Sequence, residues 1–285
     1  MTALKIAIQK SGRLSEDSLR LFKECGIKIN NGARKLKAIA SNFPVEFLFL
    51  RDDDIPGYVA DGVADLGIVG QNVLIESQKD IAEVKLLGFS KCRLSLAVAK
   101  EVEYSGLDYF EGKNIATSYP NLLLKYLNEN QIQASIHEIS GSVEIAPGIG
   151  LAEGICDIVS SGSTLMSNGL KEVEVVLRSE AVLVSHRGLT LDKQRLLNQL
   201  LFRIDAVLEG KNNKYVLLNA PNESIDEIVK LLPGMRSPTV LPLATKGWSS
   251  IHSVINEDAF WDKIEQLKAA GAEGILVVPI EKMIS

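Results

Sequence analysis

Residues 144–165 read EIAPGIGLAEGICDIVSSGSTL, and this stretch decides how the whole chain is interpreted. Its centre, residues 155–159, is an apolar run that predicts a buried strand. Small hydroxyl residues and glycine follow, and a new helix is expected after them. Backbone N–H groups at such a junction lack partners, and glycine lets an anion come close. The stretch predicts a phosphate-binding loop, with Asp157 placed to accept hydrogen bonds from sugar hydroxyls. A serine-rich turn without a ligand is the competing interpretation.

Composition narrows the class of protein. The chain has 285 residues, of which 46% are hydrophobic and 24% charged, as in globular proteins of two or three domains. A net charge of -5 argues against a broad nucleic-acid or anionic-membrane surface. The three cysteines are widely spaced, which indicates neither a disulfide framework nor a zinc site. No signal peptide or membrane-spanning run is apparent, so we expect a cytoplasmic protein without membrane or nucleic-acid partners.

Other polar loops follow predicted strands. Residues 4–8 and 45–50 are apolar, and the loops after them carry Lys10, Arg13 and Arg51. The carboxyl edge of an open α/β sheet binds ligands, so these cations could meet anionic groups there; solvated loop cations are the alternative. Ser15 is predicted to cap the first helix. For the aspartates at 52–54, helix capping is favoured over magnesium binding.

An internal comparison suggests two related lobes. Residues 59–70 (VADGVADLGIVG) and 151–162 (LAEGICDIVSSG) align without a gap, with identities at Ala60/Ala152, Gly62/Gly154, Asp65/Asp157 and Gly70/Gly162. Strand-like stretches at 81–89 and 93–98 are expected to pass to the second lobe, and those at 173–177 and 181–184 to return to the first. Two lobes joined by crossings form a cleft that can close on a ligand.

The pattern changes near residue 215. A helix at 191–208 and a polar linker at 209–214 precede a βαββαβ order, which is that of a ferredoxin-like domain. No catalytic cluster stands out in this part. By fold analogy, such a domain senses a ligand or mediates assembly.

These segments together resemble the ATP phosphoribosyltransferases, the first enzymes of histidine biosynthesis. The resemblance covers essentially the whole chain, and the third domain is similar to that of the long form. It rests on the pattern from Glu144 to Leu165 and on six further motifs: QKSGRLS from Gln9, RDDDIPG from Arg51, DLGIVG from Asp65, CRLSLA from Cys92, ATSYP from Ala116 and VPIEKM from Val278.

The resemblance implies an α/β fold with two type II periplasmic-binding-protein-like lobes and a C-terminal ferredoxin-like, ACT-like domain. We expect residues 1–95 with 183–210 to form the first lobe, 96–182 the second, and 211–285 a regulatory histidine-binding domain. The implied reaction transfers phosphoribosyl from phosphoribosyl pyrophosphate to N1 of ATP with Mg²⁺, releasing pyrophosphate. The family is also inhibited by histidine and assembles from dimers into hexamers.

The resemblance also implies roles for individual residues. The loop that binds phosphoribosyl pyrophosphate would comprise Glu144, Asp157, Ser160, Ser161, Gly162, Ser163 and Thr164. The candidates for ATP or pyrophosphate are Lys10, Arg13, Arg51, Gly70 and Tyr119, where Tyr119 stacks on the nucleotide or has a capping and packing role. The candidates for histidine are Asn219, Met235, Thr239 and Gly274. The family can carry an acidic residue at the place of Asn219. No catalytic nucleophile is expected, and the protein ligands of Mg²⁺ are not assigned.

Two rival interpretations share parts of this pattern. A solute-binding module has a two-lobed cleft but normally carries an export signal. A prephenate-dehydratase-like enzyme also joins a two-lobed catalytic part to a small regulatory domain, but it leaves the hydroxyl-rich loop unexplained.

Overall fold

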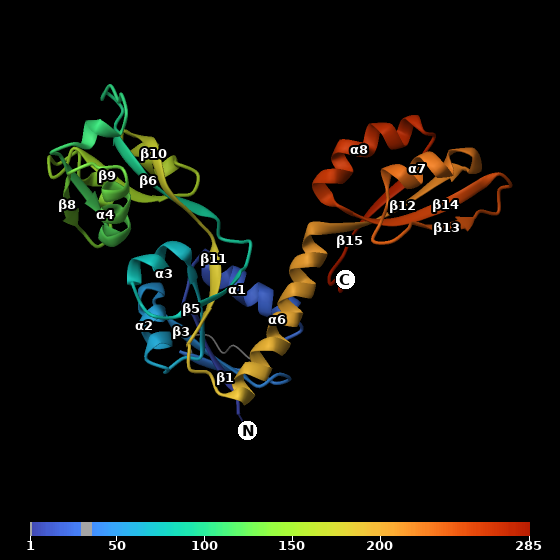
Figure 1. The fold of residues 1–285 in the computed structure, drawn as a ribbon, viewed down its shortest axis with the longest axis horizontal. Helices are drawn as coiled ribbons and strands as arrows, with labels where there is room; N and C mark the ends of the chain where they lie inside the picture. The colour runs from blue at the N-terminus through green and yellow to red at the C-terminus, as the bar shows by residue number, and fades with distance from the viewer. Residues whose placement is uncertain (1, 30–35) are drawn as a thin grey trace. The chain divides into compact units, whose positions relative to one another are not determined.

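The computed structural model describes residues 2–29 and 36–285. The chain divides into two compact units, Met1–Arg20 with Ile27–Leu196, and Leu21–Gly26 with Leu197–Ser285. Three sheets can be followed in Figure 1, two in the first unit and one in the second. Within the described ranges, no helix has the length and apolar character needed to cross a membrane.

The first sheet forms the core of the first lobe, with the strand order β2-β3-β1-β4-β11-β5. β1 lies between β3 and β4 and is parallel to both, while β11 runs antiparallel to β4 and β5. Most residues of β1 and β3 are buried, as expected for strands covered on both faces. The strands are β1 Leu4–Gln9, β2 Lys37–Ile39, β3 Val45–Leu50, β4 Leu66–Gly70, β5 Ala82–Leu86 and β11 Ala181–Ser185.

The helices of this lobe correct two predictions. They are α1 Arg13–Glu24, η1 Asp52–Asp54, α2 Ile55–Ala60 and α3 Gln71–Ser77. Because α1 begins at Arg13, Ser15 lies inside the helix and is buried, so the predicted N-cap is wrong. Asp54 precedes α2 but makes no side-chain capping hydrogen bond, so side-chain capping does not explain this aspartate.

The second lobe is built on the sheet β10-β6-β9-β7-β8. Its apolar core lies between this sheet and its helices, with Leu94, Phe110 and Leu123 among the fully buried residues. The strands are β6 Cys92–Ala99, β7 Asn114–Thr117, β8 Ser135–Glu138, β9 Gly154–Val159 and β10 Leu170–Ser179. The helical segments are η2 Leu107–Phe110, α4 Pro120–Glu129, η3 Val143–Ile145 and α5 Ser163–Ser167.

The two sheets share one topology. In the first, β3-β1-β4-β11-β5, and in the second, β8-β7-β9-β6-β10, both follow the order 2-1-3-n-4, where strand n arrives from the other lobe. This is the type II periplasmic-binding-protein-like arrangement, and the predicted fold class is confirmed. The expected domain limits at 95/96, 182/183 and 210/211 fall within β6, β11 and α6 Leu191–Asn212. The division into domains itself stays a prediction.

The internal repeat is only partly structural. β4 and β9 occupy the same place in their sheets, and Gly70 and Gly162 each immediately precede a helix. The aspartates of the gapless alignment are not equivalent, because Asp65 lies just before β4 whereas Asp157 lies near the end of β9. The alignment therefore matches helix starts but not strand registers.

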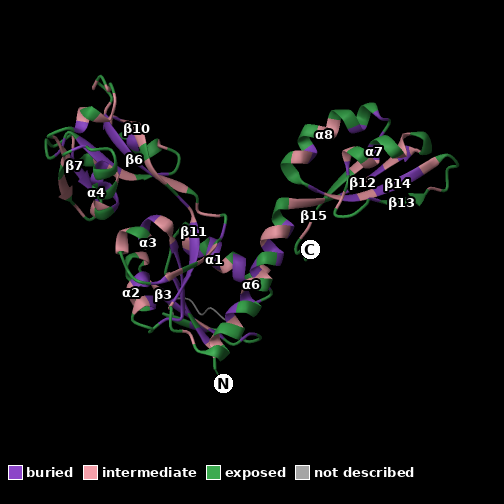
Figure 2. Ribbon diagram, viewed as in Figure 1, coloured by how far each residue is buried: buried purple, intermediate pink, exposed green. Residues whose placement is uncertain are grey.

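The C-terminal part is a four-stranded antiparallel sheet of order β13-β14-β12-β15 with the connectivity βαββαβ, as predicted. Figure 2 shows buried residues along β12 and β14, whereas β13 is exposed. The predicted linker at 209–214 is wrong, because α6 continues to Asn212 and passes directly into β12. The elements are β12 Asn213–Pro221, η4 Asn222–Ser224, α7 Ile225–Leu231, β13 Thr239–Pro242, β14 Trp248–Asn256, α8 Glu257–Ala269 and β15 Glu273–Pro279.

Candidate active site

The loop from Ser160 to Gly162 joins β9 to α5 and leaves backbone donors available. Gly162 has φ +82°, a left-handed conformation that glycine adopts without steric cost. A Cβ on Gly162 would meet only Val159 Cγ1, at 3.9 Å, so the space beside the loop is open. Among the described residues, the amides of Ser161, Gly162 and Thr164 have no acceptor within the chain. These amides can therefore hold an anion.

Hydroxyl groups extend this set of donors. Ser161 Oγ and Ser163 Oγ lie 3.0 Å apart, and the Ser163 amide donates to Ser161 Oγ at 3.4 Å. α5 has only five residues, so anion binding would depend on the loop amides and hydroxyls and not on a helix dipole.

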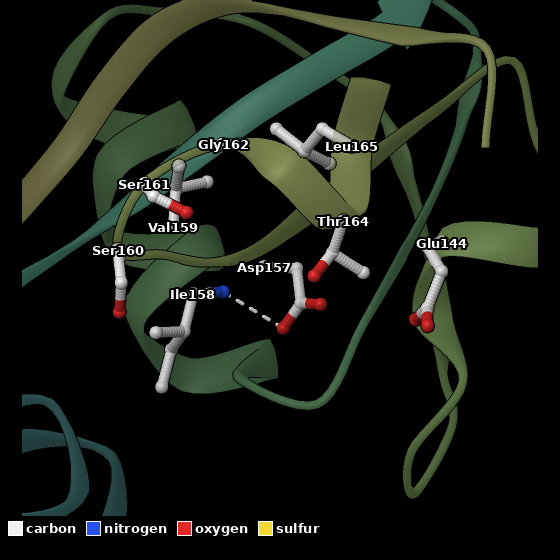
Figure 3. Close-up of a pocket in the computed structure, with 9 residues that line it drawn as sticks. All are labelled: Glu144, Asp157, Ile158, Val159, Ser160, Ser161, Gly162, Thr164 and Leu165. Carbon is white, nitrogen blue, oxygen red and sulfur yellow. Dashed lines mark hydrogen bonds between the residues drawn. The ribbon is translucent and has the colours of Figure 1, made fainter. Parts of the chain in front are cut away.

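A cavity of about 260 Å³ opens at this loop. Figure 3 shows Asp157 projecting from β9, Thr164 from the start of α5, and Glu144 from η3. The cavity thus combines hydrogen-bond donors suited to a phosphate with two carboxylates. Its lining consists of Glu144, Asp157, Ile158, Val159, Ser160, Ser161, Gly162, Thr164 and Leu165.

The Asp157 carboxylate is half-buried and has no cationic partner among the described residues. The Ile158 amide donates to Asp157 Oδ1 at 2.7 Å (Figure 3). Burial raises the pKa of Asp157 above its ordinary value, and the negative charge of Glu144 raises it further. A desolvated carboxylate without a cation is well suited to accept hydrogen bonds from ligand hydroxyls.

Arg93 binds the backbone at the start of the loop, a role that no local sequence pattern indicates. Its guanidinium forms two bonds of 2.5 Å to Glu172 of β10 and donates from Nη1 to the Ser160 carbonyl at 3.2 Å. Ser95 donates to the same Glu172 at 2.8 Å, and the bonds from Arg93 lower the pKa of Glu172. A paired arginine of the crossing strand β6 therefore holds the start of the loop.

A second cavity, of about 570 Å³, lies between the two lobes of the first unit. The first lobe contributes residues of η1 and α3, and the second contributes the β7–α4 junction and the loop after β8. Arg51 and Tyr119, two of the predicted nucleotide residues, both line it. The full lining is Arg51, Asp52, Asp53, Val73, Glu76, Ser77, Ser118, Tyr119, Pro120, Glu138, Ile139, Ser140 and Gly141.

The other predicted nucleotide residues lie outside this lining. Lys10 follows β1 at the edge where Arg51 follows β3, since the Lys10 amide donates to Leu50 O at 2.7 Å. Arg13 is the first residue of α1, and its Nε lies 3.9 Å from Asp17. Gly70 ends β4, next to Asn72. The geometry thus groups Lys10 with Arg51 and leaves Arg13 and Gly70 apart from the cavity.

Tyr119 packs against the core of the second lobe, and its hydroxyl accepts a hydrogen bond of 3.1 Å from Asn72 Nδ2. Burial raises the pKa of Tyr119, so the phenol stays protonated at neutral pH. Tyr119 therefore has the packing role, but its side chain makes no capping hydrogen bond to α4, and stacking on a nucleotide stays a prediction.

The residues predicted to bind histidine form two groups in the C-terminal domain. A Cβ built on Gly274 would lie 3.3 Å from Asn219 Nδ2, which places these two residues together. Met235 and Thr239 line a separate cavity of about 460 Å³. Tyr215 and His252 line the same cavity, and the Tyr215 hydroxyl lies 2.7 Å from His252 Nδ1. Sequence patterns did not single out this pair, because its members lie on different strands.

Comparison with known proteins identifies the family. Residues 51–206 match the family described as ATP phosphoribosyltransferase, and residues 210–282 match the one described as HisG, C-terminal domain. The chain belongs to the ATP phosphoribosyltransferase family. Its C-terminal domain makes it a long-form member, as predicted. Membership of this family makes the chain a pentosyltransferase of histidine biosynthesis.

Individual relatives agree with this assignment. The chain is 62% identical to the ATP phosphoribosyltransferase of Cytophaga hutchinsonii over 283 residues, and 59% identical to that of Phocaeicola vulgatus over 281; each match covers 99% of both chains. Among solved structures, the ATP phosphoribosyl transferase (HisG:HisZ) complex from Thermotoga maritima matches with a TM-score of 0.61 and 27% identity, covering 70% of this chain and 96% of that one. Neither rival interpretation, the solute-binding module or the dehydratase, accounts for these matches.

Proposed function

We propose that the chain transfers the phosphoribosyl group of phosphoribosyl pyrophosphate to N1 of the ATP adenine, giving phosphoribosyl-ATP and pyrophosphate. The observation that carries this proposal is the β9–α5 loop, where free amides and hydroxyls adjoin two carboxylates in one cavity. The amides of Ser161, Gly162 and Thr164 suit the 5-phosphate. Asp157 and Glu144 suit the ribose hydroxyls.

The chemistry follows from this arrangement. The N1 lone pair of adenine forms the new bond to the anomeric carbon, while the bond from that carbon to the pyrophosphate oxygen breaks and its electron pair leaves with pyrophosphate. Asp157 and Glu144 lie where they can stabilise positive charge that develops on the ribose. The two cavities supply a place for each substrate, so positioning and electrostatics account for catalysis without a covalent intermediate.

The cations near the second cavity suit the triphosphate or the departing pyrophosphate. Arg51 lines that cavity, and Lys10 lies at the same sheet edge. Their charge offsets the nearby carboxylates of Asp52 and Asp53. Burial and the negative charge of Asp52 raise the pKa of Asp53, while the positive charge of Arg51 lowers it.

The donor set of the first cavity fits Mg²⁺. Asp157 and Glu144 are oxygen ligands without a cationic partner among the described residues, and Mg²⁺ is commonly held by one or two carboxylates together with substrate phosphates. When bound, the ion would neutralise charge on the leaving pyrophosphate. No group of three or more metal-binding side chains occurs in residues 2–29 and 36–285, consistent with substrate supplying most ligands.

Turnover tests this proposal directly. Pyrophosphate release is measured on the intact chain with ATP, phosphoribosyl pyrophosphate and Mg²⁺, and the purine product is identified by mass. We expect release that requires all three components, stops on chelation and returns when Mg²⁺ is added. Release without ATP, or no product carrying ribose on adenine, would refute the reaction.

We further propose that the C-terminal domain binds histidine as feedback inhibitor and that the chain forms dimers and hexamers in the reducing cytoplasm. The Tyr215–His252 cavity with Met235 and Thr239 supports a small-ligand site, and the described cysteines are all free. Calorimetry with histidine and mass photometry with and without it are the tests. Absence of heat would remove the regulatory part and leave the reaction untouched.

A further inference from the structure

Helix α3 of the first lobe reaches across to the N-terminus of α4 in the second lobe (Figure 1). Glu76 Oε1 accepts from the Asn121 amide and Oε2 from the Leu122 amide, each at 2.9 Å. The Asn121 side chain donates back to the Glu76 carbonyl at 3.0 Å. One carboxylate therefore binds two consecutive amides of another lobe.

These bonds replace a helix cap that α4 lacks. The first amides of a helix have no intrahelical acceptors and are usually bound by the side chain of the N-cap residue. The N-cap residue of α4 is Tyr119, which makes no side-chain capping bond, and Pro120 has no N–H to donate. Asn121 and Leu122 thus present the first available amides, and a carboxylate there is also favoured by the helix dipole.

A second contact lies on the same face of α3. Asn72, four residues before Glu76, donates from Nδ2 to the Tyr119 hydroxyl at 3.1 Å. Asn72 is buried and held by Ser179, which accepts from its amide at 3.1 Å and donates to its Oδ1 at 2.8 Å. Ser179 ends β10 of the second lobe, so Asn72 is bound to two residues of that lobe, Ser179 and Tyr119.

We propose that Glu76 is a positioning residue that fastens the two lobes to each other at the 570 Å³ cavity. Glu76 and Tyr119 line that cavity from opposite lobes, so the α3–α4 contact sets its width without any ligand. The same contact occupies the α4 N-terminus, which leaves that helix end closed to a ligand phosphate. This inference goes beyond the proposed reaction, since it concerns the unliganded chain.

The test uses the intact chain without substrate. Glu76→Gln keeps the shape of the side chain but removes its charge and one acceptor. Glu83→Gln is the matched control, because Glu83 lies exposed on β5 of the same lobe. Hydrogen exchange is followed at the amides of residues 121 and 122. We expect about tenfold faster exchange in Glu76→Gln, the change that corresponds to losing one charge-assisted hydrogen bond, and no change in the control.

Lobe separation is measured in the same variants by pulsed electron paramagnetic resonance. Spin labels are attached at positions 61 and 125, both exposed, after half-buried Cys92 is replaced by serine, and labelled chain is diluted with unlabelled chain. We expect a larger share of long distances in Glu76→Gln only. Asn121→Ala removes just the bond to the Glu76 carbonyl and should give a smaller change in the same direction. This variant replaces Glu76→Gln as the test if Glu76→Gln does not fold.

Two outcomes would overturn the proposal. Unchanged exchange at 121 and 122 would mean that the bonds are not kept in solution. Faster exchange with an unchanged distance distribution would mean that Glu76 caps α4 but does not hold the lobes. Neither result depends on which substrates the chain turns over, so the inference fails or stands separately from the proposed reaction.

Discussion

The junction between β4 and α3 in the first lobe and that between β9 and α5 in the second occupy the same place in their sheets but use their amides differently. α3 starts directly after Gly70, and its first amides are bound, Gln71 to the Glu180 carbonyl at 3.0 Å and Asn72 to Ser179 Oγ at 3.1 Å. Ser160–Gly162 separate β9 from α5, and the amides there stay available. Because β9 ends three residues before its helix, whereas β4 ends directly before α3, the second junction is left open as an anion site.

The two aligned aspartates, Asp65 and Asp157, differ in the same way: the first is bound within its lobe and the second is available to a ligand. Asp65 is buried and pairs with Lys193 Nζ at 2.6 Å while accepting from the Lys5 amide at 2.9 Å. Among the described residues, Asp157 accepts a hydrogen bond only from the adjacent Ile158 amide, and it faces a cavity. The first aspartate stabilises its lobe, whereas the second is left for a ligand at a cost in stability.

The largest expected effect is a loss of affinity for phosphoribosyl pyrophosphate when the open β9–α5 junction is blocked. Gly162→Val forces a β-branched residue into φ +82° and places its side chain beside the loop amides. Strain of this kind costs about 1–3 kcal/mol, and we expect affinity for phosphoribosyl pyrophosphate to fall about a hundredfold in calorimetry. Gly88→Val is the control, since Gly88 has φ +75° with open space around it and does not line the loop cavity. Equal affinities in both variants would show that the loop does not bind this substrate.

The next largest effect is the loss of stability when the Asp65–Lys193 ion pair of the first lobe is removed. Asp65→Asn leaves Lys193 without its partner in a mostly buried place, and we expect the free energy of unfolding to drop by about 2–3 kcal/mol in urea titration. Asp192→Asn, which breaks an exposed pair with Arg195, should change it by less than about 0.5 kcal/mol. Similar losses in the two variants would contradict the structural role of Asp65.

Asp157→Asn should have the opposite effect on stability. Burial and Glu144 hold the pKa of Asp157 above its value in the unfolded chain, so the charged form costs stability as the pH rises through the folded-state pKa. The variant should therefore be slightly more stable than the native chain at neutral pH and equal to it at acid pH. We also expect kcat/KM to fall about tenfold, as a charged hydrogen bond to ribose is weakened. If the variant were less stable and fully active, Asp157 would be a structural residue and not a ligand-binding one.

The smallest expected effect concerns the support of the loop. Arg93→Lys keeps the charge but cannot bind Glu172 through two nitrogens and reach the Ser160 carbonyl as well. We expect the Kd for phosphoribosyl pyrophosphate to rise about fivefold, equal to about 1 kcal/mol. The Kd for ATP should change less. Arg187→Lys, at an exposed pair with Asp80, is the control and should leave both constants unchanged.

Local patterns were enough to predict the loop, the two α/β lobes and the βαββαβ domain, whereas the type II periplasmic-binding-protein-like arrangement was implied by the family resemblance. Serines and a glycine between an apolar run and a helix identify residues 160–164, and alternating strand and helix patterns identify the βαββαβ domain. The equivalence of Asp65 and Asp157 could not be judged, because a gapless alignment contains no information on strand register. Ser15 was misplaced because Arg13 already starts α1, and a buried serine inside a helix resembles an N-cap in sequence.

The supporting contacts were beyond sequence reasoning for a different reason. Arg93 and Glu172 are 79 residues apart, and Glu76 and Asn121 are 45 apart. Each joins strands or helices that meet only in the folded chain, so no local spacing marks them. An arginine in an apolar strand and a glutamate in a short helix are both common as surface residues. Their partners, and so their roles, emerge only from the fold.

A structure of the chain with phosphoribosyl pyrophosphate and Mg²⁺ tests the central claim most directly. We predict the 5-phosphate within hydrogen-bond distance of the Ser161, Gly162 and Thr164 amides, with the ribose hydroxyls on Asp157 and Glu144. A 5-phosphate seated at the β4–α3 junction, or beside Arg51 with the β9–α5 loop empty, would contradict the account.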